Sequence, residues 1–163
     1  MNSSTGRKKI LYIDMDNVLV DFESSIRQLD AATKQAHQGD HSAGISPTFD
    51  EIPHIFSNPE PMKDAVESFC VLCNHFDVYI LSTAPWENET AWSDKLLWVK
   101  KHLGEPAYKR LILTHHKNLN RGDFLVDDRS KNGAAEFEGE WIEFGSDIFP
   151  DWKTVLEYLL QKK

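Results

Sequence analysis

Short apolar runs alternate with amphipathic segments along most of the chain. The apolar runs cover residues 10–13, 77–81, 111–113, 124–126 and 141–144, and polar or turn-forming residues follow most of them. Runs of this length and composition are typical of buried strands. Strands that alternate with helices predict an α/β protein with a Rossmann-like, five-stranded parallel sheet between helices.

Four other segments carry apolar residues at the spacing of amphipathic helices. Pro61 is suited to the start of a helix, where its missing N–H is tolerated. Gly104 is a good helix stop, and Asp151 is a good N-cap. The sequence therefore predicts helices over residues 21–38, from Pro61 onward, over residues 88–103 and after Asp151.

The expected helix over residues 88–103 places a lysine next to the core. Its apolar residues recur at helical spacing and predict a core face made of Trp92, Leu96, Val99 and Leu103. Lys95 lies at the edge of that face. We therefore assign Trp92 to the core, with a substrate contact as the alternative.

Residues 39–61 are rich in Gly, Pro, Ser and Asp and interrupt the alternation of strands and helices. A loop of this length is uncommon unless it is functional or flexible. Because it comes soon after the first strand, we interpret residues 22–60 as a small cap inserted into a single domain of residues 1–163. A surface elaboration without a role is the alternative.

Composition and charge narrow the classes of partner. The chain of 163 residues can bury an independent core, and its five tryptophans are typical of a globular protein. The net charge of −8 argues against general binding of nucleic acid or anionic membranes, although it permits binding of a single phosphate group. No apolar run approaches the length of a membrane span.

The N-terminus and the cysteines favour a cytoplasmic location. The segment MNSSTGRKK lacks the apolar stretch of a secretory signal and is expected to be a loose tail. Cys70 and Cys73 lie three residues apart, with Val66 and Phe69 on the same expected helix face. No second pair completes a zinc site, so we expect core thiols in a reducing compartment rather than a redox pair.

Polar clusters follow the ends of four expected strands. In a parallel α/β sheet, ligands bind beyond the carboxyl ends of the strands. An Asx turn would explain any one such cluster as loop chemistry. Four at one edge instead predict a shared ligand, held by Asp14 and Asp16, Ser82 and Thr83, His115 and Lys117, and Asp127 and Asp128.

The side-chain types in these clusters suit phosphate chemistry. Carboxylates that converge without a cation repel each other, and an oxygen-only set favours a hard cation such as Mg²⁺. Ser82, Thr83 and Lys95 are the donors and the positive charge that a phosphoryl group needs. Of Asp14 and Asp16, one can attack phosphorus while the other transfers a proton.

The order of these motifs resembles the haloacid dehalogenase (HAD) superfamily of phosphohydrolases. It comprises DMDNV, then ILST after the second strand, a lysine thirteen residues after the serine in KLLWVKKHLG, and VDD. Within the superfamily, DMDxVLxDFE, LTHHK and VDDR resemble the 5′(3′)-deoxyribonucleotidase group. The resemblance covers residues 9–130, and four motifs in register make it specific.

The resemblance implies separate roles for the first two carboxylates. Asp14 would be the nucleophile that forms an aspartyl-phosphate and would also bind Mg²⁺. Asp16 would protonate the leaving nucleoside oxygen and then activate water, while its backbone carbonyl binds the metal. Asp128 would be a direct metal ligand, with Asp127 as its supporting partner.

The resemblance also implies the substrate contacts. Ser82 would hold the phosphate with Thr83 beside it, and Lys95 would neutralise the phosphoryl oxygens and orient Asp14. Phe22 would pack on the nucleobase. The expected partner is a small nucleoside monophosphate, and the chain is expected to be a monomer or a homodimer.

Several residues depart from the family pattern. Asn17 replaces the usual glycine, which the tolerance of asparagine for left-handed geometry permits. SerThrAlaPro replaces ThrSerPro at residues 82–85, and His115 stands where an arginine would contribute to phosphate binding. The cap does not align with the family. Trp86 could reach the substrate, whereas His116, Lys117 and Arg129 are expected to be loop or rim residues.

The leading hypothesis is a Mg²⁺-dependent phosphomonoesterase that acts on deoxyribonucleoside 5′(3′)-monophosphates. One alternative is a phosphatase of another small ester, such as a sugar phosphate. A receiver-like phospho-signalling module also clusters Asp, Ser/Thr and Lys at strand ends. Such a module accepts its phosphoryl group on a middle strand and lacks a cap after the first strand, so the sequence argues against it.

Overall fold

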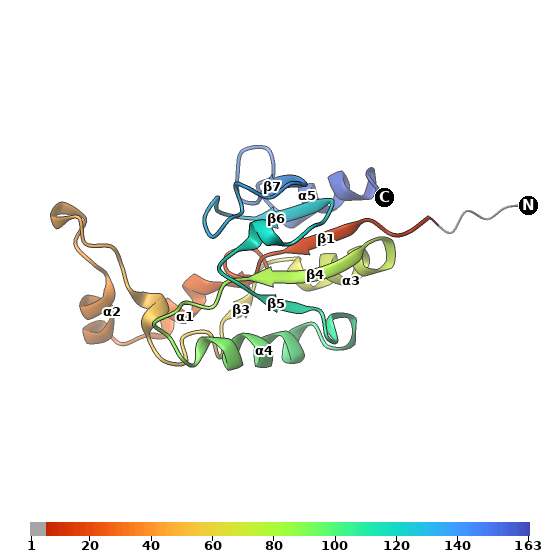
Figure 1. Ribbon diagram of the computed structural model, residues 1–163. Helices are drawn as coiled ribbons and strands as arrows, with labels where there is room; N and C mark the ends of the chain where they lie inside the picture. Colours follow the sequence, from red (N-terminus) through yellow and green to blue (C-terminus); the bar gives the residue numbers. More distant parts are fainter. Residues whose placement is uncertain (1–5) are drawn as a thin grey trace, which may run out of the picture.

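A five-stranded parallel sheet forms the centre of the computed structural model, which describes residues 6–163 (Figure 1). The strand order is β5-β4-β1-β6-β7, and all four pairings are parallel. The five predicted strands are confirmed as β1 (Ile10–Ile13), β4 (Asp77–Ser82), β5 (Leu111–Leu113), β6 (Phe124–Asp127) and β7 (Glu140–Glu143). The start of the expected N-terminal tail, residues 1–5, lies outside the described residues.

Strand β1 lies between β4 and β6 and is buried on both faces. Leu11 and Ile13 belong to the main apolar cluster, whereas Tyr12 belongs to a smaller cluster with Leu125 and Phe137. This alternation follows from the two-residue period of a strand. The continuous apolar sequence of β1 therefore reflects its central place, because each face of the sheet needs its own apolar layer.

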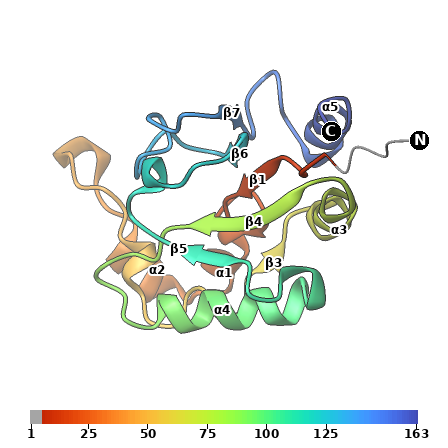
Figure 2. The ribbon, with the colours of Figure 1, turned by 45° about the vertical axis from the view of Figure 1, so that its right-hand side comes forward.

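The two faces of the sheet are covered differently. Figure 2 shows helices α3 (Ala65–His75), α4 (Ala91–His102) and α5 (Trp152–Leu160) around the sheet. Residues of all three helices belong to the main cluster. On the other face, Ala134 and Phe137 of the turns after β6 cover Tyr12 and Leu125. The parallel sheet is thus as predicted, but turns take the place of helices on its second face.

The predicted core face of α4 is confirmed at Val99 and Leu103, which are buried, but is wrong at Trp92 and Leu96. Trp92 is 45% exposed and Leu96 is 41% exposed, whereas Lys95, Trp98 and Val99 are buried. The helix is rotated because the ammonium group of Lys95 is paired inside the protein with a carboxylate. Once its charge is compensated, the long apolar stem of a lysine can be buried.

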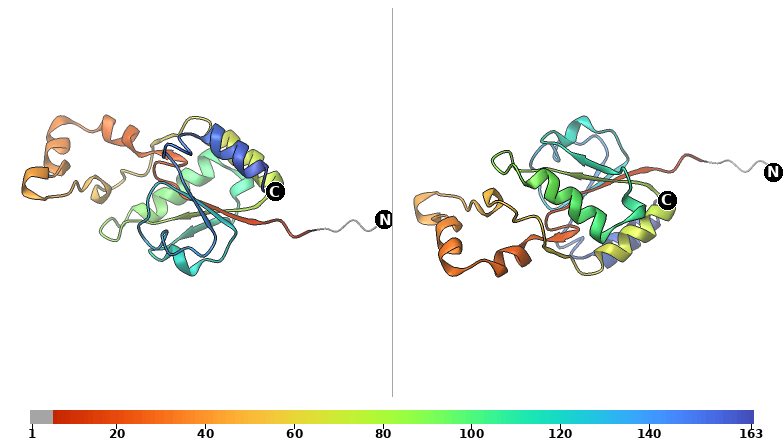
Figure 3. Two further views of the ribbon diagram at one scale, coloured as in Figure 1. Left: turned by 90° about the horizontal axis from the view of Figure 1, so that it is seen from above. Right: turned by 90° about the horizontal axis from the view of Figure 1, so that it is seen from below.

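Residues 22–60, called here the inserted segment, project from the carboxyl edge of the sheet (Figures 1 and 3). The short strands β2 (Val20–Asp21) and β3 (Glu60–Pro61) pair antiparallel at its base. The segment contains α1 (Phe22–Gln28), α2 (Ala31–His37) and two 3₁₀ helices, η1 (His41–Ala43) and η2 (Phe49–Glu51).

Two predicted helix boundaries around the inserted segment are wrong. The single helix expected over residues 21–38 is broken at Leu29, whose backbone is extended, and Asp30 caps a second helix by accepting from the N–H of Thr33. Pro61 belongs to β3, and α3 starts only at Ala65. The pairing of β3 with β2 holds Pro61 in an extended conformation.

Other predictions concern helix ends, thiols and membrane spans. Asp151 caps α5 by accepting from the N–H of Thr154, as predicted.

Cys70 and Cys73 are both half-buried and form no disulfide within residues 6–163. Burial raises the pKa of Cys73 to about 11. No helix in that range combines the length and apolar character needed to cross a membrane.

Candidate active site

The four polar clusters meet at the carboxyl edge of the sheet, beside a cavity of about 720 Å³. This volume lies within the range of small-molecule sites. One wall comes from the sheet edge and the other from the inserted segment, and the lining includes Asp14, Asp16, Phe22, Phe56, Thr83, Trp86, His115, Lys117, Asp127 and Arg129. The shared edge predicted from the strand ends is therefore present.

A tight turn after β1 delivers the first two carboxylates. The backbone N–H of Asp14 donates to the carbonyl of Val126, which continues the pairing of β1 with β6. The carbonyl of Met15 then accepts from three successive N–H groups, those of residues 18–20. Asn17 has a φ of 58° in this turn, the left-handed geometry that its side-chain type tolerates.

Lys117 lies inside the site, and its expected place on the rim is wrong. It is 3% exposed, its Nζ is 3.0 Å from Oδ1 of Asp14, and it also pairs with Asp127. Burial alone would lower the pKa of Lys117, but the carboxylates of Asp14 and Asp127 outweigh it and raise that pKa. Its position after β5, at the same edge as the other clusters, was the available signal in the sequence.

Asp14, Asp127 and Asp128 form an acidic cluster in which one carboxylate oxygen from each lies within 4.8 Å of the others. Burial and the charge of Asp14 raise the pKa of Asp127 to about 7, and the same two causes raise the pKa of Asp128. Asn17 donates to Oδ2 of Asp128 at 3.4 Å. Oδ1 of Asp128 is buried and has no hydrogen-bond partner among residues 6–163.

The acidic cluster has the composition of a cation site. Three carboxylates face one buried ammonium group, that of Lys117, while Arg129 approaches Asp128 only at 3.7 Å from a half-exposed position. Oδ1 of Asp128 accepts no hydrogen bond, and the charge of Asp14 adds to the burial that raises the pKa values of Asp127 and Asp128, so the negative charge here is incompletely compensated. Because the ligands are all oxygen atoms, a hard divalent cation fits these residues.

Asp16 has a different set of neighbours. Its Oδ2 accepts from Lys95 Nζ at 2.7 Å, and the same ammonium group lies 3.2 Å from Ser82 Oγ. Burial raises the pKa of Asp16 and Asp14 adds to the rise, although Lys95 opposes it. The expected orientation of Asp14 by Lys95 is not what the structure shows, because Lys95 contacts Asp16 and Lys117 contacts Asp14.

The remaining predicted residues surround this centre. Ser82 is fully buried at the end of β4, and Thr83 donates its hydroxyl to the carbonyl of Thr114 at 2.7 Å. His115 lies edge-to-face with Trp86 with ring centroids 6.0 Å apart, and Trp86 is 78% exposed beside the cavity. Both rings can therefore meet a bound molecule.

The inserted segment contributes a pair of stacked aromatic rings. Phe22, at the start of α1, and Phe56 have centroids 5.1 Å apart and an interplanar angle of 25°. Phe56 also lies beside Lys95, whose Nζ is 4.5 Å from the ring centroid. Sequence reasoning identified Phe22 but missed Phe56, since no pattern marks a single aromatic residue in an irregular segment.

Asn88 ties the inserted segment to the core and was also missed. It is 2% exposed, and its amide group donates to the carbonyls of Asp50 and Ile52 while its oxygen accepts from Thr90. The indole of Trp98 donates to the carbonyl of Pro59 farther along the segment. The wall of the cavity that carries Phe56 is therefore anchored on the residues before and within α4.

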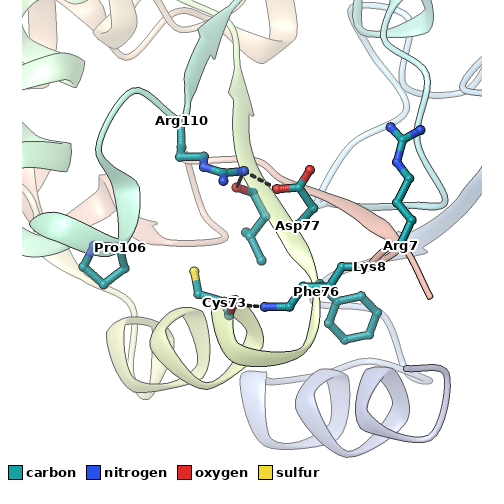
Figure 4. Close-up of a pocket in the computed structure, with 8 residues that line it drawn as sticks. Arg7, Lys8, Cys73, Phe76, Asp77, Pro106 and Arg110 are labelled. Atoms are coloured by element: carbon teal, nitrogen blue, oxygen red, sulfur yellow. Dashed lines mark hydrogen bonds and ion pairs between the residues drawn. The ribbon is translucent and has the colours of Figure 1, made fainter. Parts of the chain in front are cut away.

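A second hollow, of about 370 Å³, lies away from this edge, near the start of β4 (Figure 4). Most of its charged groups are already bonded, since Arg110 donates to Asp77 and Lys8 donates to the carbonyl of Cys73, and Arg7 is the further charged residue in its lining. The metal-compatible acidic cluster is at the carboxyl edge instead. The carboxyl edge therefore has the composition that phosphate chemistry needs, and this hollow does not.

Comparison with protein families and with curated proteins gives a consistent result. The family described as "5′ nucleotidase, deoxy (Pyrimidine), cytosolic type C protein" matches residues 48–150. A protein of Vibrio phage KVP40, named as a candidate 5′(3′)-deoxyribonucleotidase, is 57% identical over 152 residues, which is 93% of this chain and 85% of that protein. A Bordetella pertussis protein of the same name is 34% identical over 77% of each chain.

Solved structures agree with the fold. A HAD hydrolase of Bacillus subtilis, solved with bound magnesium, superposes with a TM-score of 0.60 at 11% identity and covers 96% of this chain and 98% of its own. A haloacid dehalogenase-like hydrolase of Xanthomonas campestris gives a TM-score of 0.61 at 8% identity and covers 96% of both chains. At such low identity these likenesses concern the architecture, which is the predicted Rossmann-like HAD fold.

Proposed function

The chain belongs to the 5′(3′)-deoxyribonucleotidase family of nucleotide phosphatases, and we propose that it hydrolyses deoxyribonucleoside 5′- or 3′-monophosphates through a covalent intermediate on Asp14. The observation that carries the proposal is the division of the carboxylates. Asp14 lies with Asp127 and Asp128 in the acidic cluster, whereas Asp16 lies apart with Lys95 and Ser82.

In the first step, a carboxylate oxygen of Asp14 attacks phosphorus, and the bond from phosphorus to the nucleoside oxygen breaks. The leaving oxygen takes a proton from Asp16. The raised pKa of Asp16 supports this role, because a carboxyl group must hold its proton near neutral pH to serve as an acid. The products are an aspartyl-phosphate and a free nucleoside.

In the second step, a water molecule attacks phosphorus and Asp16 accepts its proton. The bond from phosphorus to Asp14 breaks, which regenerates the Asp14 carboxylate and releases inorganic phosphate. One residue thus serves as acid and then as base, a reversal that general acid–base catalysis permits when the group is held in place. The contact of Asp16 with Lys95 provides that fixation.

Asp14, Asp128 and the backbone carbonyl of Asp16 would hold Mg²⁺, with Asp127 in support. When bound, Mg²⁺ neutralises the carboxylates and the phosphoryl oxygens, so that one anion can approach another. Asp127 holds Lys117 and accepts from the N–H of Arg129 at 3.1 Å, which fixes the loop that carries Asp128. Oδ1 of Asp128 accepts no hydrogen bond among residues 6–163, which supports its role as a ligand.

Lys95, Lys117, Ser82 and Thr83 would receive the phosphoryl oxygens. Two buried ammonium groups and two hydroxyl-bearing residues are suited to a phosphate that develops charge during transfer. The hydroxyl of Ser82 already lies 3.2 Å from Lys95 Nζ. His115 lines the same cavity, where the family pattern would have an arginine.

The inserted segment would act as the cap that selects the nucleoside. Phe22 lines the cavity and offers a ring on which a base can stack. Stacking of a base on an aromatic ring contributes about 1–3 kcal/mol. The proposed substrate is therefore a nucleotide rather than a sugar phosphate, which has no aromatic group to use this wall.

A phosphate-release panel with Mg²⁺ tests the proposal. It contains dUMP, dTMP, their 3′ isomers, the matching ribonucleotides and sugar phosphates. Faster hydrolysis of the deoxyribonucleotides, abolished by EDTA and restored by Mg²⁺, is the expected result. A clear preference for sugar phosphates would overturn the substrate, and hydrolysis that resists EDTA would overturn the role of the metal.

A further inference from the structure

The ammonium group of Lys95 is enclosed on several sides although it carries a full charge. The residue has no exposed surface. Nζ contacts Oδ2 of Asp16 at 2.7 Å and Oγ of Ser82 at 3.2 Å. These two contacts use two of its three N–H donors. The ring centroid of Phe56 lies 4.5 Å from the same nitrogen.

Phe56 is itself held firmly. It is 3% exposed and packs with Ile55, Ala84 and Ala91 in an apolar cluster of its own. On each side of it, the inserted segment is bonded to the core, through Asn88 at Ile52 and through Trp98 at Pro59. The ring therefore has a fixed position relative to the helix that carries Lys95.

A buried ammonium group needs compensation on every side from which water is excluded. The face of an aromatic ring carries negative potential and attracts a cation within about 6 Å, and the attraction is strongest where both groups are desolvated. Lys95 and Phe56 meet these conditions of distance and burial. An aliphatic side chain at position 56 would exclude water but would not attract the charge.

We propose that Phe56 is a positioning residue, whose ring holds the ammonium group of Lys95 against Asp16 and Ser82. The inference rests on the proposed function, because it assigns Lys95 to the phosphate and Asp16 to proton transfer. The inserted segment would then have two roles, contact with the nucleoside and positioning of Lys95. Since Phe22 stacks on Phe56, this aromatic pair joins the nucleoside side of the cavity to the phosphate side.

Fluorinated phenylalanines at position 56 test the proposal without changing the shape of the core. Replacement by mono-, di- and trifluorinated phenylalanine weakens the potential of the ring face stepwise. We expect kcat for dUMP to fall stepwise, by about tenfold for the trifluorinated ring. The affinity for inorganic phosphate, measured by calorimetry with Mg²⁺, should fall in the same order.

Phe69 provides the matched control. It is fully buried in α3, in a different apolar cluster from Phe56. The same fluorinated series at Phe69 should leave kcat and phosphate affinity unchanged. A second variant, Phe56→Leu, keeps an apolar side chain and should lower kcat about as much as the trifluorinated ring does.

The outcomes separate this inference from the proposed function. If the unmodified chain hydrolyses dUMP but kcat and phosphate affinity stay constant across the series at position 56, the role of Phe56 is refuted and the reaction stands. If Phe56→Leu raises only the KM for dUMP, the residue is a pocket wall and the inference is refuted. If dUMP is not hydrolysed but phosphate affinity falls stepwise, the reaction is refuted and the positioning role stands.

Discussion

Two buried lysines divide the carboxylates of the site between them, and their surroundings differ. Lys117 pairs with Asp14 and Asp127 in the acidic cluster, where negative charge exceeds positive charge. Lys95 contacts one carboxylate, one hydroxyl group and one aromatic ring, so its charge is nearly matched. The side with excess charge is suited to a metal and a nucleophile, whereas the balanced side is suited to moving a proton.

The largest effect on turnover is expected when the proposed nucleophile, Asp14, is replaced. Asp14→Asn should lower kcat for dUMP by a factor on the order of 10⁴ or more, since a covalent route needs its attacking group. The fold should persist, because one carboxylate of a repelling group has been neutralised. Phosphate release and circular dichroism measure the two effects. Normal turnover in this variant would remove Asp14 from the mechanism.

The proposed proton transfer on the Lys95 side is tested by replacing Asp16, the general acid. Asp16→Asn should lower kcat for dUMP by roughly 10²- to 10⁴-fold, the usual contribution of a general acid. An aryl phosphate with a good leaving group needs no proton in the first step, so its kcat/KM, which reports that step, should fall less than that of dUMP. Mg²⁺ affinity should change little, because the carbonyl of residue 16 remains. A collapse of metal affinity in calorimetry would show that the two sides had been assigned the wrong way round.

Replacement of each buried lysine by methionine tests whether the metal binds on the Lys117 side or on the Lys95 side. Lys117→Met and Lys95→Met should each lower the free energy of unfolding in EDTA by about 3 kcal/mol, because each leaves buried carboxylates without their partner. Mg²⁺ should restore more stability to the Lys117 variant, since the metal adds positive charge to the same cluster. Urea unfolding with EDTA or with Mg²⁺ measures this, and equal recovery of the two variants would contradict the proposed metal position.

The stability of the protein should depend on pH through the acidic cluster. Burial and Asp14 raise the pKa of Asp127 to about 7, well above its usual value of 3.8. A carboxyl group whose pKa is raised by folding stabilises the protein at low pH, and this contribution is lost as pH rises toward 7. In EDTA, the melting temperature should therefore fall between about pH 4 and pH 7.

Mg²⁺ should oppose this fall. Protons compete with the metal for Asp127 and Asp128, so the gain in melting temperature on adding Mg²⁺ should be larger at pH 7.5 than at pH 5.5. Thermal unfolding at the two pH values provides the comparison. A gain that is equal or larger at pH 5.5 would place the metal away from these carboxylates.

The smallest expected effect concerns the nucleoside. Phe22→Leu should raise the KM for dUMP by about tenfold through loss of stacking. The KM for a small phosphate ester without a base should change less. Steady-state kinetics with both substrates separates the cases, and an equal change for both would mean that Phe22 does not select the base.

The sequence predicted the sheet and the composition of its carboxyl edge because both depend on local patterns. Apolar runs of strand length gave β1, β4 and β5, and parallel pairing then brought their polar ends together. Asn17 has the left-handed backbone expected of it. The family resemblance rested on the motifs at these strand ends and is confirmed by the family match and by the relative that is 57% identical.

The sequence predictions were wrong at places where charged residues are buried among apolar ones. Lys95 and Lys117 are both buried, although lysines are usually exposed, because the two carboxylates that follow β1, Asp16 and Asp14, compensate them. The face of α4 was therefore rotated away from Trp92. The pairings with Asp14 and Asp16 join residues far apart in the sequence, and periodicity along one segment cannot reveal them.

The inserted segment was the least predictable region. The break at Leu29 had a local signal, since Asp30 precedes Thr33 in the spacing of an N-cap. Phe56 had none, because its position depends on Asn88 and on the residues that anchor the segment to the core. Its contact with Lys95 becomes evident only in three dimensions.

Trapping of the phosphorylated enzyme tests the division of the carboxylates most directly. Turnover of phosphate-labelled dUMP with Mg²⁺ is quenched in acid, the acyl-phosphate is reduced with borohydride, and the modified residue is located by mass spectrometry. We expect the modification at Asp14 in the unmodified protein. More of it should accumulate in Asp16→Asn when the substrate is an aryl phosphate, because only the second step then needs Asp16. Reduction product at Asp16 or Asp127, or turnover without any phosphorylated protein, would contradict the account.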